Sequence, residues 1–516
     1  MKRGTKRFTI AVGVLACTIG IVGCSNSGSS NEGNGTQGTG SPSPKATESN
    51  QPKPTLKALK SFIQEDYNTY PAGKVLEERT GYKVQYDMLP KESPLDKLNL
   101  IMASGTDYDL ITVNDTNTFI KYAQSGALTD LGPLIEKYGP NIKAAIPQSS
   151  FDRIKVDGKI YGIPTISLSQ VAGGLLIRQD WLDKLNLKMP TTTDEFVAVL
   201  QAFKDKDPGG TGKNGTPFTL SSSIAAIPNL IGAFGMPNTN NQVNGKMLNV
   251  AEDPAYKDYL QFLIDLYKKG LIDNEFGSNK VETTREIFTS GRAGVIFANW
   301  ADIPTLMNTL SKTQPDAKIT YVAPLTGKGG KSGYGIPVGN AGFSIVPKSS
   351  KHQEDTVKWI NAILEKETYK LTMIGKEGVH HTYKDGQYTP ILPIFNDELN
   401  FGGNFLAGHI EAEFPIQWQA RVRKDLRLFE GFAQLNNDMA DKYKFVDILG
   451  YASGLSVTAS NSQKLNQLLN DNAVKFVMGV EDISKLPDFV KKWNAEGGEA
   501  MMKEINAWYA TYPNKK

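Results

Sequence analysis

The residues that could perform catalysis form no recognisable catalytic motif in this chain of 516 residues. Gly330-Lys331-Ser332 resembles the end of a phosphate-binding loop, but Leu325 stands where the first glycine is required. Gly333-Tyr334-Gly335 lacks the third glycine of a dinucleotide-binding motif, and no G-x-S-x-G elbow occurs in the body of the chain. These failures argue against an enzyme, and they predict no catalytic residue and no cofactor.

The histidines and the paired acids also give no clear reactive site. None of the four histidines belongs to an H-E-x-x-H pattern, and the adjacent His380 and His381 would point in different directions on a helix or strand. An ordinary loop pair is therefore favoured over a metal site, and the role of His380 is left open. Glu411 and Glu413 could share one face of a strand, as a paired-carboxylate enzyme needs. Scattered acids are common in a chain with 54 of them, so we predict neither catalysis nor a metal there.

Cys24 is the side chain whose context indicates the most specific chemistry. An apolar run, Phe8–Val22, follows the basic residues Lys2, Arg3, Lys6 and Arg7 and ends in Ile21-Val22-Gly23-Cys24. This pattern is typical of a lipoprotein signal peptide, in which the cysteine thiol accepts a diacylglyceryl group before cleavage. The alternative is an uncleaved anchor, but the run is short and rich in glycine for a membrane-spanning helix. We expect residues 1–23 to be removed and Cys24 to hold the protein on the outer face of a cell membrane.

The composition on either side of residue 54 predicts a tether and a folded body. Between Ser25 and Pro54 the only apolar side chain is Ala46, so this segment should be disordered, with a span of ~30 Å. Removing residues 1–23 takes away four positive charges and no acids, which changes the formal net charge from +3 to about −1. That balance does not indicate nucleic acid as a partner. The body contains no cysteine, which excludes disulfide bonds within it.

The body alternates between strand-like and helical segments. Thr192-Thr193-Asp194-Glu195 is a capping box before a helical apolar stripe, and Asp253-Pro254 should begin a second striped helix that ends at Gly270. Strands are predicted at 109–113, 293–298 and 341–346, and helices at 95–102, 353–364 and 462–478. This alternation predicts an α/β architecture whose ligands bind at strand ends.

Seven segments together resemble the extracellular solute-binding proteins of carbohydrate ABC importers, the family that includes maltose-binding protein. The resemblance is strongest to lipoprotein-type oligosaccharide binders of Gram-positive bacteria and to alginate-binding proteins. The segments, in order, are Glu78–Val84, Leu100–Ile111, Tyr122–Leu128, Lys137–Ile142, Asp157–Pro164, Arg178–Leu185 and Gly291–Val295. Each is weak alone, but their order over residues 55–390 is specific.

The resemblance implies a two-lobe, periplasmic-binding-protein-like fold of type II with a ligand cleft between the lobes. On this analogy, residues 55–165 and 325–395 form the N-lobe, and residues 166–324 and 396–516 form the C-lobe. The lobes would close around an oligosaccharide by a hinge motion and dock, as a monomer, on ABC importer membrane subunits. Alginate-binding relatives carry a calcium loop of the form D-P-x-G-x-G-K-x-D-E. This chain keeps Asp207 but has Gly215 and Thr216 at the paired acids, so we expect no tight calcium binding.

A sugar cleft pairs aromatic rings with amide, carboxylate and guanidinium groups, because sugars present apolar C–H faces and hydroxyls. Trp300 follows the strand 293–298, with Asn299 beside it, and the family has a sugar-stacking tryptophan in this context. Trp418 resembles the family's second aromatic wall, and Arg421 could fork to hydroxyls or a uronate carboxylate. Core packing is the alternative for both tryptophans, and a solvated helical charge is the alternative for Arg421.

Further ligand contacts are predicted at the edge of the N-lobe and at the crossover. Asn114 and Asp115 directly follow the strand 109–113, although residues of these types also form turns and caps. Tyr67 and Gln170 are weaker candidates, and Trp181 is assigned to the core. A peptide or other solute as ligand, a sensor co-receptor and a surface polysaccharide-degrading enzyme remain as alternatives, since loops rather than the fold select the ligand.

Overall fold

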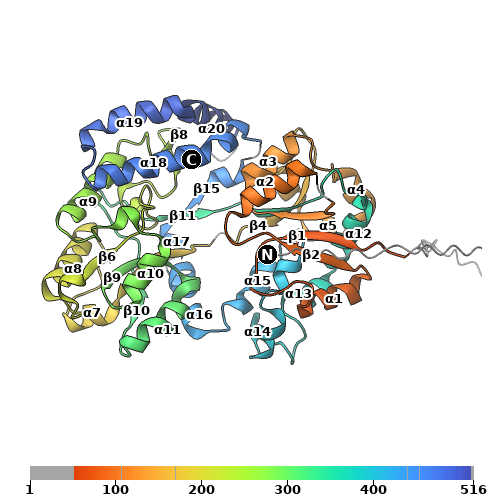
Figure 1. Cartoon of the computed structure of the whole chain (residues 1–516), viewed down its shortest axis with the longest axis horizontal. Coiled ribbons are helices and arrows are strands. Elements are labelled where there is room, and N and C mark those ends of the chain that lie inside the picture. Colours follow the sequence, from red (N-terminus) through yellow and green to blue (C-terminus); the bar gives the residue numbers. More distant parts are fainter. Residues whose placement is uncertain (1–51, 106, 169, 439, 453, 513–516) are drawn as a thin grey trace, which may run out of the picture. The chain divides into compact units, whose positions relative to one another are not determined.

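The computed structural model describes residues 52–105, 107–168, 170–438, 440–452 and 454–512 (Figure 1). The described residues from Lys53 onward belong to one compact unit. The predicted signal peptide, Cys24 and nearly all of the predicted tether lie outside the described residues. Within the described ranges, every helix is too short or too polar to cross a membrane.

The first sheet has five strands in the order β2-β1-β3-β12-β4. Its strands are β1 (Leu56–Lys60), β2 (Val84–Met88), β3 (Leu110–Val113), β4 (Gly162–Ile166) and β12 (Asn340–Ile345). β1 is parallel to β2 and β3, whereas β12 is antiparallel to both β3 and β4. The carboxyl ends of β1, β3 and β4 therefore lie at the same edge of the sheet.

Helices of this first lobe follow its strands, and several begin with proline, whose fixed φ suits the first helical turn. They are α1 (Pro71–Thr80), α2 (Pro94–Ser104), α3 (Thr116–Gln124), α4 (Gly132–Tyr138), α5 (Pro140–Ala145), α6 (Gln148–Asp152), α12 (Gln353–Ile363), α13 (Lys366–Met373), α14 (Ile394–Leu399) and α15 (Phe414–Trp418). A hairpin of β13 (His381–Lys384) and β14 (Gln387–Pro390) follows α13.

The second sheet has the order β10-β5-β9-β6. Its strands are β5 (Gly173–Arg178), β6 (Thr216–Thr219), β9 (Ala293–Asn299) and β10 (Ile319–Tyr321). β6 and β9 are parallel, and β5 is antiparallel to β9 and β10. The second lobe also contains a hairpin of β7 (Asn240–Val243) and β8 (Lys246–Asn249).

The helices of the second lobe include a long C-terminal group. They are α7 (Gln179–Lys184), α8 (Thr193–Lys206), α9 (Tyr256–Lys268), α10 (Val281–Thr289), α11 (Ile303–Thr313), α16 (Leu426–Ala433), α17 (Ala440–Tyr443), α18 (Ser456–Val477), α19 (Leu486–Trp493) and α20 (Glu499–Thr511). The predicted capping box of α8 is confirmed: the Thr192 hydroxyl accepts from the Glu195 N–H, and the Glu195 carboxylate accepts from the Thr192 N–H. α9 begins at Tyr256, two residues after the predicted Asp253-Pro254.

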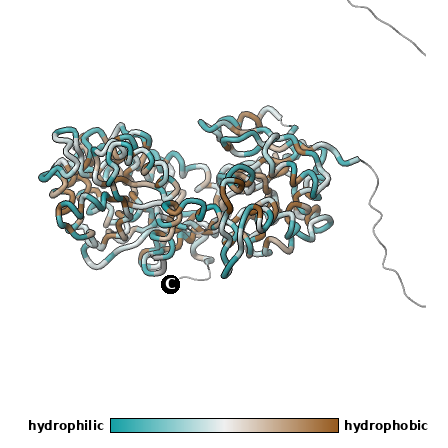
Figure 2. The backbone as a smooth tube through the Cα atoms, turned by 90° about the horizontal axis from the view of Figure 1, so that it is seen from below, coloured by the Kyte–Doolittle hydropathy of each residue, from teal (hydrophilic) through white to brown (hydrophobic). Residues whose placement is uncertain are grey.

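Separate hydrophobic cores underlie the two sheets, and hydrophobic stretches of chain (brown in Figure 2) occur in both lobes. The predicted lobe boundary at residue 395 is wrong, because Phe405, Phe414 and Ala420 pack in the first core. The ring of Phe405 lies 4.8 Å from that of Tyr67, which fixes this segment to β1's lobe. The predicted boundary at residue 325 also moves, since Leu325 belongs to the second core.

The segments that link the lobes run close together. β4 leads into β5 through residues 167–172, and β10 leads back to β12 through β11 (Tyr334–Pro337), which pairs in parallel with β15 (Lys444–Asp447). The Ser167 N–H donates to the Gly339 carbonyl at 2.9 Å. A Cβ at Gly339, whose φ is +83°, would lie 1.9 Å from the Gly450 oxygen, so these linking segments approach as closely as glycine allows.

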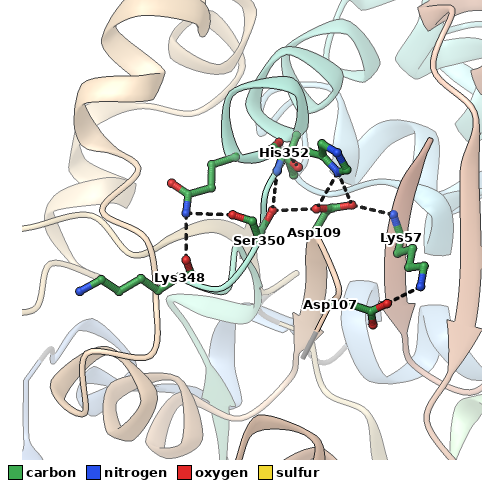
Figure 3. A network of polar contacts seen from close by, with 8 residues as sticks. Lys57, Asp107, Asp109, Lys348, Ser350 and His352 are labelled. Atoms are coloured by element: carbon green, nitrogen blue, oxygen red, sulfur yellow. Dashed lines mark hydrogen bonds and ion pairs between the residues drawn. The ribbon is translucent and has the colours of Figure 1, made fainter. Parts of the chain in front are cut away.

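A polar network around Asp109 holds the opposite end of β3 from the predicted site residues (Figure 3). Its carboxylate accepts from the backbone N–H of Lys57 at 2.9 Å and from the Ser350 hydroxyl at 2.7 Å. His352 Nδ1 lies 3.3 Å from the same carboxylate. Asp109 thus ties β1 and β3 to the start of α12 and anchors the scaffold at the amino end of β3.

Candidate functional site

Trp300 and Trp418, predicted from separate parts of the sequence, line one cavity of about 470 Å³. Their ring centroids lie 5.7 Å apart at an interplanar angle of 84°, and Phe432 lies edge-on to Trp300 at 5.4 Å. Both tryptophans are half-buried. The lining consists of Trp300, Ala301, Pro304, Asn396, Trp418, Arg421, Val422, Lys424, Asp425 and Leu428. The structure therefore unites the two aromatic candidates with Arg421.

The two lobes contribute to this cavity from defined elements. Trp300 opens η4 (Trp300–Asp302) directly after β9, and its backbone N–H donates to the Ala172 carbonyl at 3.0 Å. Asp302 in the same turn accepts from Arg285 Nη2 at 2.7 Å. Trp418 ends α15, which packs against the first core. The site thus forms where the chain passes from the first core to the second.

Arg421 is half-buried beside the cavity and is bound to backbone carbonyl groups. Its Nε donates to the Asn400 oxygen at 3.2 Å and its Nη2 to the Leu399 oxygen at 3.1 Å. Burial lowers the pKa of Arg421 to about 10, a value at which the guanidinium is still protonated at neutral pH. The alternative of a freely solvated helical charge is therefore wrong for this residue.

Lys424 and Asn396 line the cavity but were not among the predicted contacts. Lys424 Nζ donates to the Asn400 side-chain oxygen at 2.6 Å, and burial together with the charge of Arg421 lowers its pKa. Asn396 lies in a segment that the predicted boundary at residue 395 assigned to the other lobe, and no local motif distinguishes Lys424 from a lysine on the surface.

Asn299 is exposed at the end of β9 and borders a second cavity of about 290 Å³. This cavity also contains Thr219 from the end of β6 and the ion-paired Arg285 and Asp302. Residues 299–302 therefore contribute to two cavities, one containing Trp300 and the other Asn299.

The predicted contacts at the first sheet have different surroundings. Asn114 is exposed and donates to the Ser61 hydroxyl at 2.9 Å, at the carboxyl edge of β1 and β3. Asp115 caps α3, accepting from the Thr118 N–H at 2.7 Å, which is the competing local role. Tyr67 is 1% exposed, and its hydroxyl donates to the Ser61 carbonyl, so its ring is part of the core.

Gln170 lies at the first crossover and is half-buried, outside the lining of the cavities described above. The next residue, Val171, exchanges hydrogen bonds with the side chain of Asn436: its N–H donates to Oδ1 at 2.9 Å and its carbonyl accepts from Nδ2 at 3.1 Å. The structure therefore does not bring Gln170 together with Trp300 and Trp418.

The sequence comparison identifies the family to which this arrangement belongs. Residues 53–370 match the profile of the bacterial extracellular solute-binding proteins, which is more than half of the chain. The chain is a member of this family. Lipoprotein LipO of Bacillus subtilis is 28% identical over 474 residues, 89% of this chain and 92% of its own length. Polygalacturonan/rhamnogalacturonan-binding protein YtcQ of the same species is 26% identical over 84% of this chain and 86% of its own.

Solved structures confirm the predicted two-lobe α/β fold. The alginate-binding protein AlgQ2 without calcium superposes with a TM-score of 0.67 at 21% identity, covering 90% of this chain and 99% of that one. An EF-hand mutant of the Streptococcus pneumoniae substrate-binding protein FusA, in complex with fructo-nystose, gives 0.68 at 21% identity, covering 89% and 99%. By sequence, FusA is 32% identical over 248 residues, 44% of this chain and 46% of its own.

In this solute-binding protein, Glu413 and His380 have structural partners. Glu411 and Glu413 lie in a turn before α15 rather than on a strand, and Glu413 pairs with Lys366 at 3.2 Å. His380 lies between the Lys376 N–H, which donates to Nδ1 at 3.0 Å, and Glu398, 3.0 Å from Nε2. These contacts fix the hairpin β13–β14.

Two further residues of the solute-binding protein have structural surroundings. Trp181 is 4% exposed and packs edge-on against Phe203, which agrees with its assignment to the core. In the loop that resembles a calcium site, the Asp207 carboxylate accepts from the Gly212 N–H at 2.7 Å and the Thr211 N–H at 3.0 Å. Within the described ranges, no three His, Cys, Asp or Glu side chains gather as metal ligands.

Proposed function

We propose that the protein binds an oligosaccharide outside the cell and delivers it, as a monomer, to the membrane subunits of an ABC importer. The cavity lined by Trp300 and Trp418 carries this proposal. Aromatic rings offer a surface to the apolar faces of a pyranose, and Asn396, Arg421 and Asp425 around them offer partners for its hydroxyls.

The names of the relatives support a carbohydrate as the solute. FusA is named a fructooligosaccharide ABC transporter substrate-binding protein, and YtcQ is named for polygalacturonan and rhamnogalacturonan. Another Streptococcus pneumoniae relative, 25% identical over 40% of this chain, is named a carbohydrate ABC transporter substrate-binding protein. These are binding proteins, so we propose no reaction for this chain.

A thermal-shift screen of the full chain tests the proposal. The panel contains plant and microbial oligosaccharides, amino sugars and short peptides. A ligand at a hundredfold excess over its Kd stabilises the folded state by ~2.7 kcal/mol, which raises Tm measurably. A saccharide that raises Tm supports the proposal. A peptide hit without any saccharide hit, or cleavage of a polysaccharide, would contradict it.

We also propose that a lipid on Cys24 holds the protein on the outer face of the cell membrane. The lipobox Ile21-Val22-Gly23-Cys24 and the naming of LipO as a lipoprotein support this. Replacing Cys24 with Ala should move the protein from the membrane fraction to the soluble fraction, as detected by immunoblot. Equal retention of the wild type and Cys24→Ala would contradict lipid anchoring.

A further inference from the structure

The cavity between Trp300 and Trp418 is bordered by cations that lack carboxylate partners. The segment 421–424 carries Arg421, Arg423 and Lys424, and the first and last of these line the cavity. Among the described residues, none of the three has a carboxylate oxygen within 4.0 Å. Their hydrogen bonds go instead to neutral groups.

The neutral partners hold these side chains in place without cancelling their charge. Arg421 donates to two backbone carbonyls, and Lys424 donates to the Asn400 side-chain oxygen. Arg423 donates to the Tyr388 carbonyl at 3.2 Å and to the Gln419 side-chain oxygen at 2.7 Å. Asn400 therefore binds both cavity cations, Arg421 through its backbone and Lys424 through its amide, and brings like charges together. Such an arrangement is unfavourable unless an anion is added.

The one carboxylate in the lining does not supply that anion. Asp425 forms a two-pronged ion pair with Arg427, with Nη2–Oδ2 at 2.7 Å and Nε–Oδ1 at 3.1 Å. The charge of Asp425 is thereby matched by Arg427, so the lining residues and Arg427 together carry an excess of two positive charges.

We propose that this cavity binds an anionic sugar unit, whose carboxylate or sulfate group lies against Arg421 and Lys424 while its ring contacts the tryptophans. This inference rests on the proposed oligosaccharide-binding function and narrows its substrate class. A carboxylate or sulfate accepts charge-assisted hydrogen bonds, which are stronger than those from neutral hydroxyls, and it relieves the repulsion between the two cations.

The experiment compares acidic oligosaccharides with neutral ones of the same backbone. Oligomers of galacturonate, mannuronate and glucuronate are each paired with their carboxyl-reduced counterparts, and sulfated oligosaccharides with their desulfated forms. Binding to the full chain is measured by calorimetry at two salt concentrations. We expect at least one acidic member to bind roughly tenfold or more tightly than its neutral partner, with the difference shrinking at high salt. If the protein binds the acidic member more tightly only in the uronate pairs, the bound anion is a carboxylate; if only in the sulfated pairs, it is a sulfate.

Lys424→Met is the test variant. Lys424 donates to the Asn400 side chain, whereas Arg421 donates to the backbone carbonyls of Leu399 and Asn400, so replacing Arg421 would also disturb the fold. Lys424→Met should reduce the affinity for the acidic ligand roughly tenfold while leaving its neutral partner's affinity and Tm nearly unchanged. Lys312→Met, at an exposed position in the last turn of α11, is the matched control and should change neither.

Each result bears on one of the two proposals. If neutral oligosaccharides bind as tightly as acidic ones, or Lys424→Met affects both equally, the anion inference fails and the oligosaccharide-binding function stands. If no sugar binds, acidic or neutral, both fail.

Discussion

At the scale of single residues, Trp300 decides whether the aromatic cavity is a binding surface or a fragment of core. Its ring contacts Trp418 and Phe432 edge-on and also packs on the second lobe's hydrophobic residues. It is half-buried, however, and lines the cavity, unlike Tyr67, whose ring is enclosed. The two possibilities differ in what removal of the ring would change.

Replacing Trp300 with Ala should weaken oligosaccharide binding by ~1–3 kcal/mol if the ring stacks on a sugar. Calorimetric titration with a ligand found in the screen measures this loss. Trp508→Ala is the control, because Trp508 is also half-buried in the second lobe but contacts Tyr512 outside the cavity, with ring centroids 5.2 Å apart. Unchanged affinity in Trp300→Ala, together with a lower Tm, would assign Trp300 to the core.

Lys60 gives a second prediction at this scale, because it is 1% exposed at the end of β1. Its Nζ donates to the Leu406 carbonyl at 3.1 Å, and burial lowers its pKa from 10.5 to about 7. Between these values the unfolded chain binds a proton that the folded chain does not. Lys60 therefore makes the free energy of unfolding rise with pH above about 7, by at most ~1.4 kcal/mol per pH unit, and fall as pH decreases towards 7.

Urea unfolding of the wild type and Lys60→Met between pH 6 and 9 isolates this contribution, which the variant should lose. Lys57→Met in the same strand is the control, since Lys57 pairs with Asp107, which raises its pKa and keeps it protonated throughout that range. Parallel pH profiles for the wild type and Lys60→Met would contradict the lowered pKa.

A ligand-contact residue could be predicted from the sequence only when the residues next to it in the chain indicated that role. Trp300 was predicted from its place after the strand 293–298 and Trp418 from the family resemblance, and the structure brings both rings to one cavity. The sequence could not decide whether Asp115 contacts the ligand or caps a helix, because either role would use its carboxylate at the same place after the strand. Tyr67 was misplaced towards the ligand because its burial depends on Phe405, more than three hundred residues away.

At the scale of elements, sequence patterns within one helix were sufficient to predict that helix. The sequence did not show against which lobe a distant segment packs. The capping box of α8 lies within one turn and the apolar stripe of α9 within one helix, so the helices were predicted closely. The segment 396–420 has short elements and no periodicity, and its place follows from packing against β1's lobe. Asn396 was missed for the same reason, since its position depends on that segment.

The loop after α8 carries a prediction about metal. Because Gly212 and Thr211 donate to the Asp207 carboxylate, its oxygens already have partners, and Gly215 and Thr216 bring no carboxylate to the loop. The Tm should therefore be the same in excess chelator and in millimolar calcium, as measured by differential scanning calorimetry. Magnesium at equal concentration controls for ionic strength. A calcium-specific rise of several degrees would show that the loop or another site binds the ion.

At the scale of the whole molecule, we propose that the two lobes close around a ligand by a change in the segments that link them. The linking segments are few, and two of them touch at Gly339 and Gly450, where a change of backbone angle could alter the angle between lobes. The predicted lobe boundaries at residues 165 and 325 lie within a few residues of the observed links, whereas the boundary at residue 395 does not, because no local motif marks that crossing. The structure places this crossing beyond Ala420, next to Trp418.

We expect ligand binding to reduce the radius of gyration, measured by small-angle X-ray scattering on the full chain with and without a saccharide from the screen. Gly339→Ala should weaken both this compaction and the affinity, because its Cβ would lie 1.9 Å from the Gly450 oxygen and force the linking segments apart. Gly329→Ala is the matched control: its φ of +81° is equally unfavourable for alanine, but nothing lies within 4 Å of the added Cβ. A radius unchanged by saturating ligand would exclude closure. Equal effects of the two variants would mean that backbone strain, rather than the contact between linking segments, limits the motion.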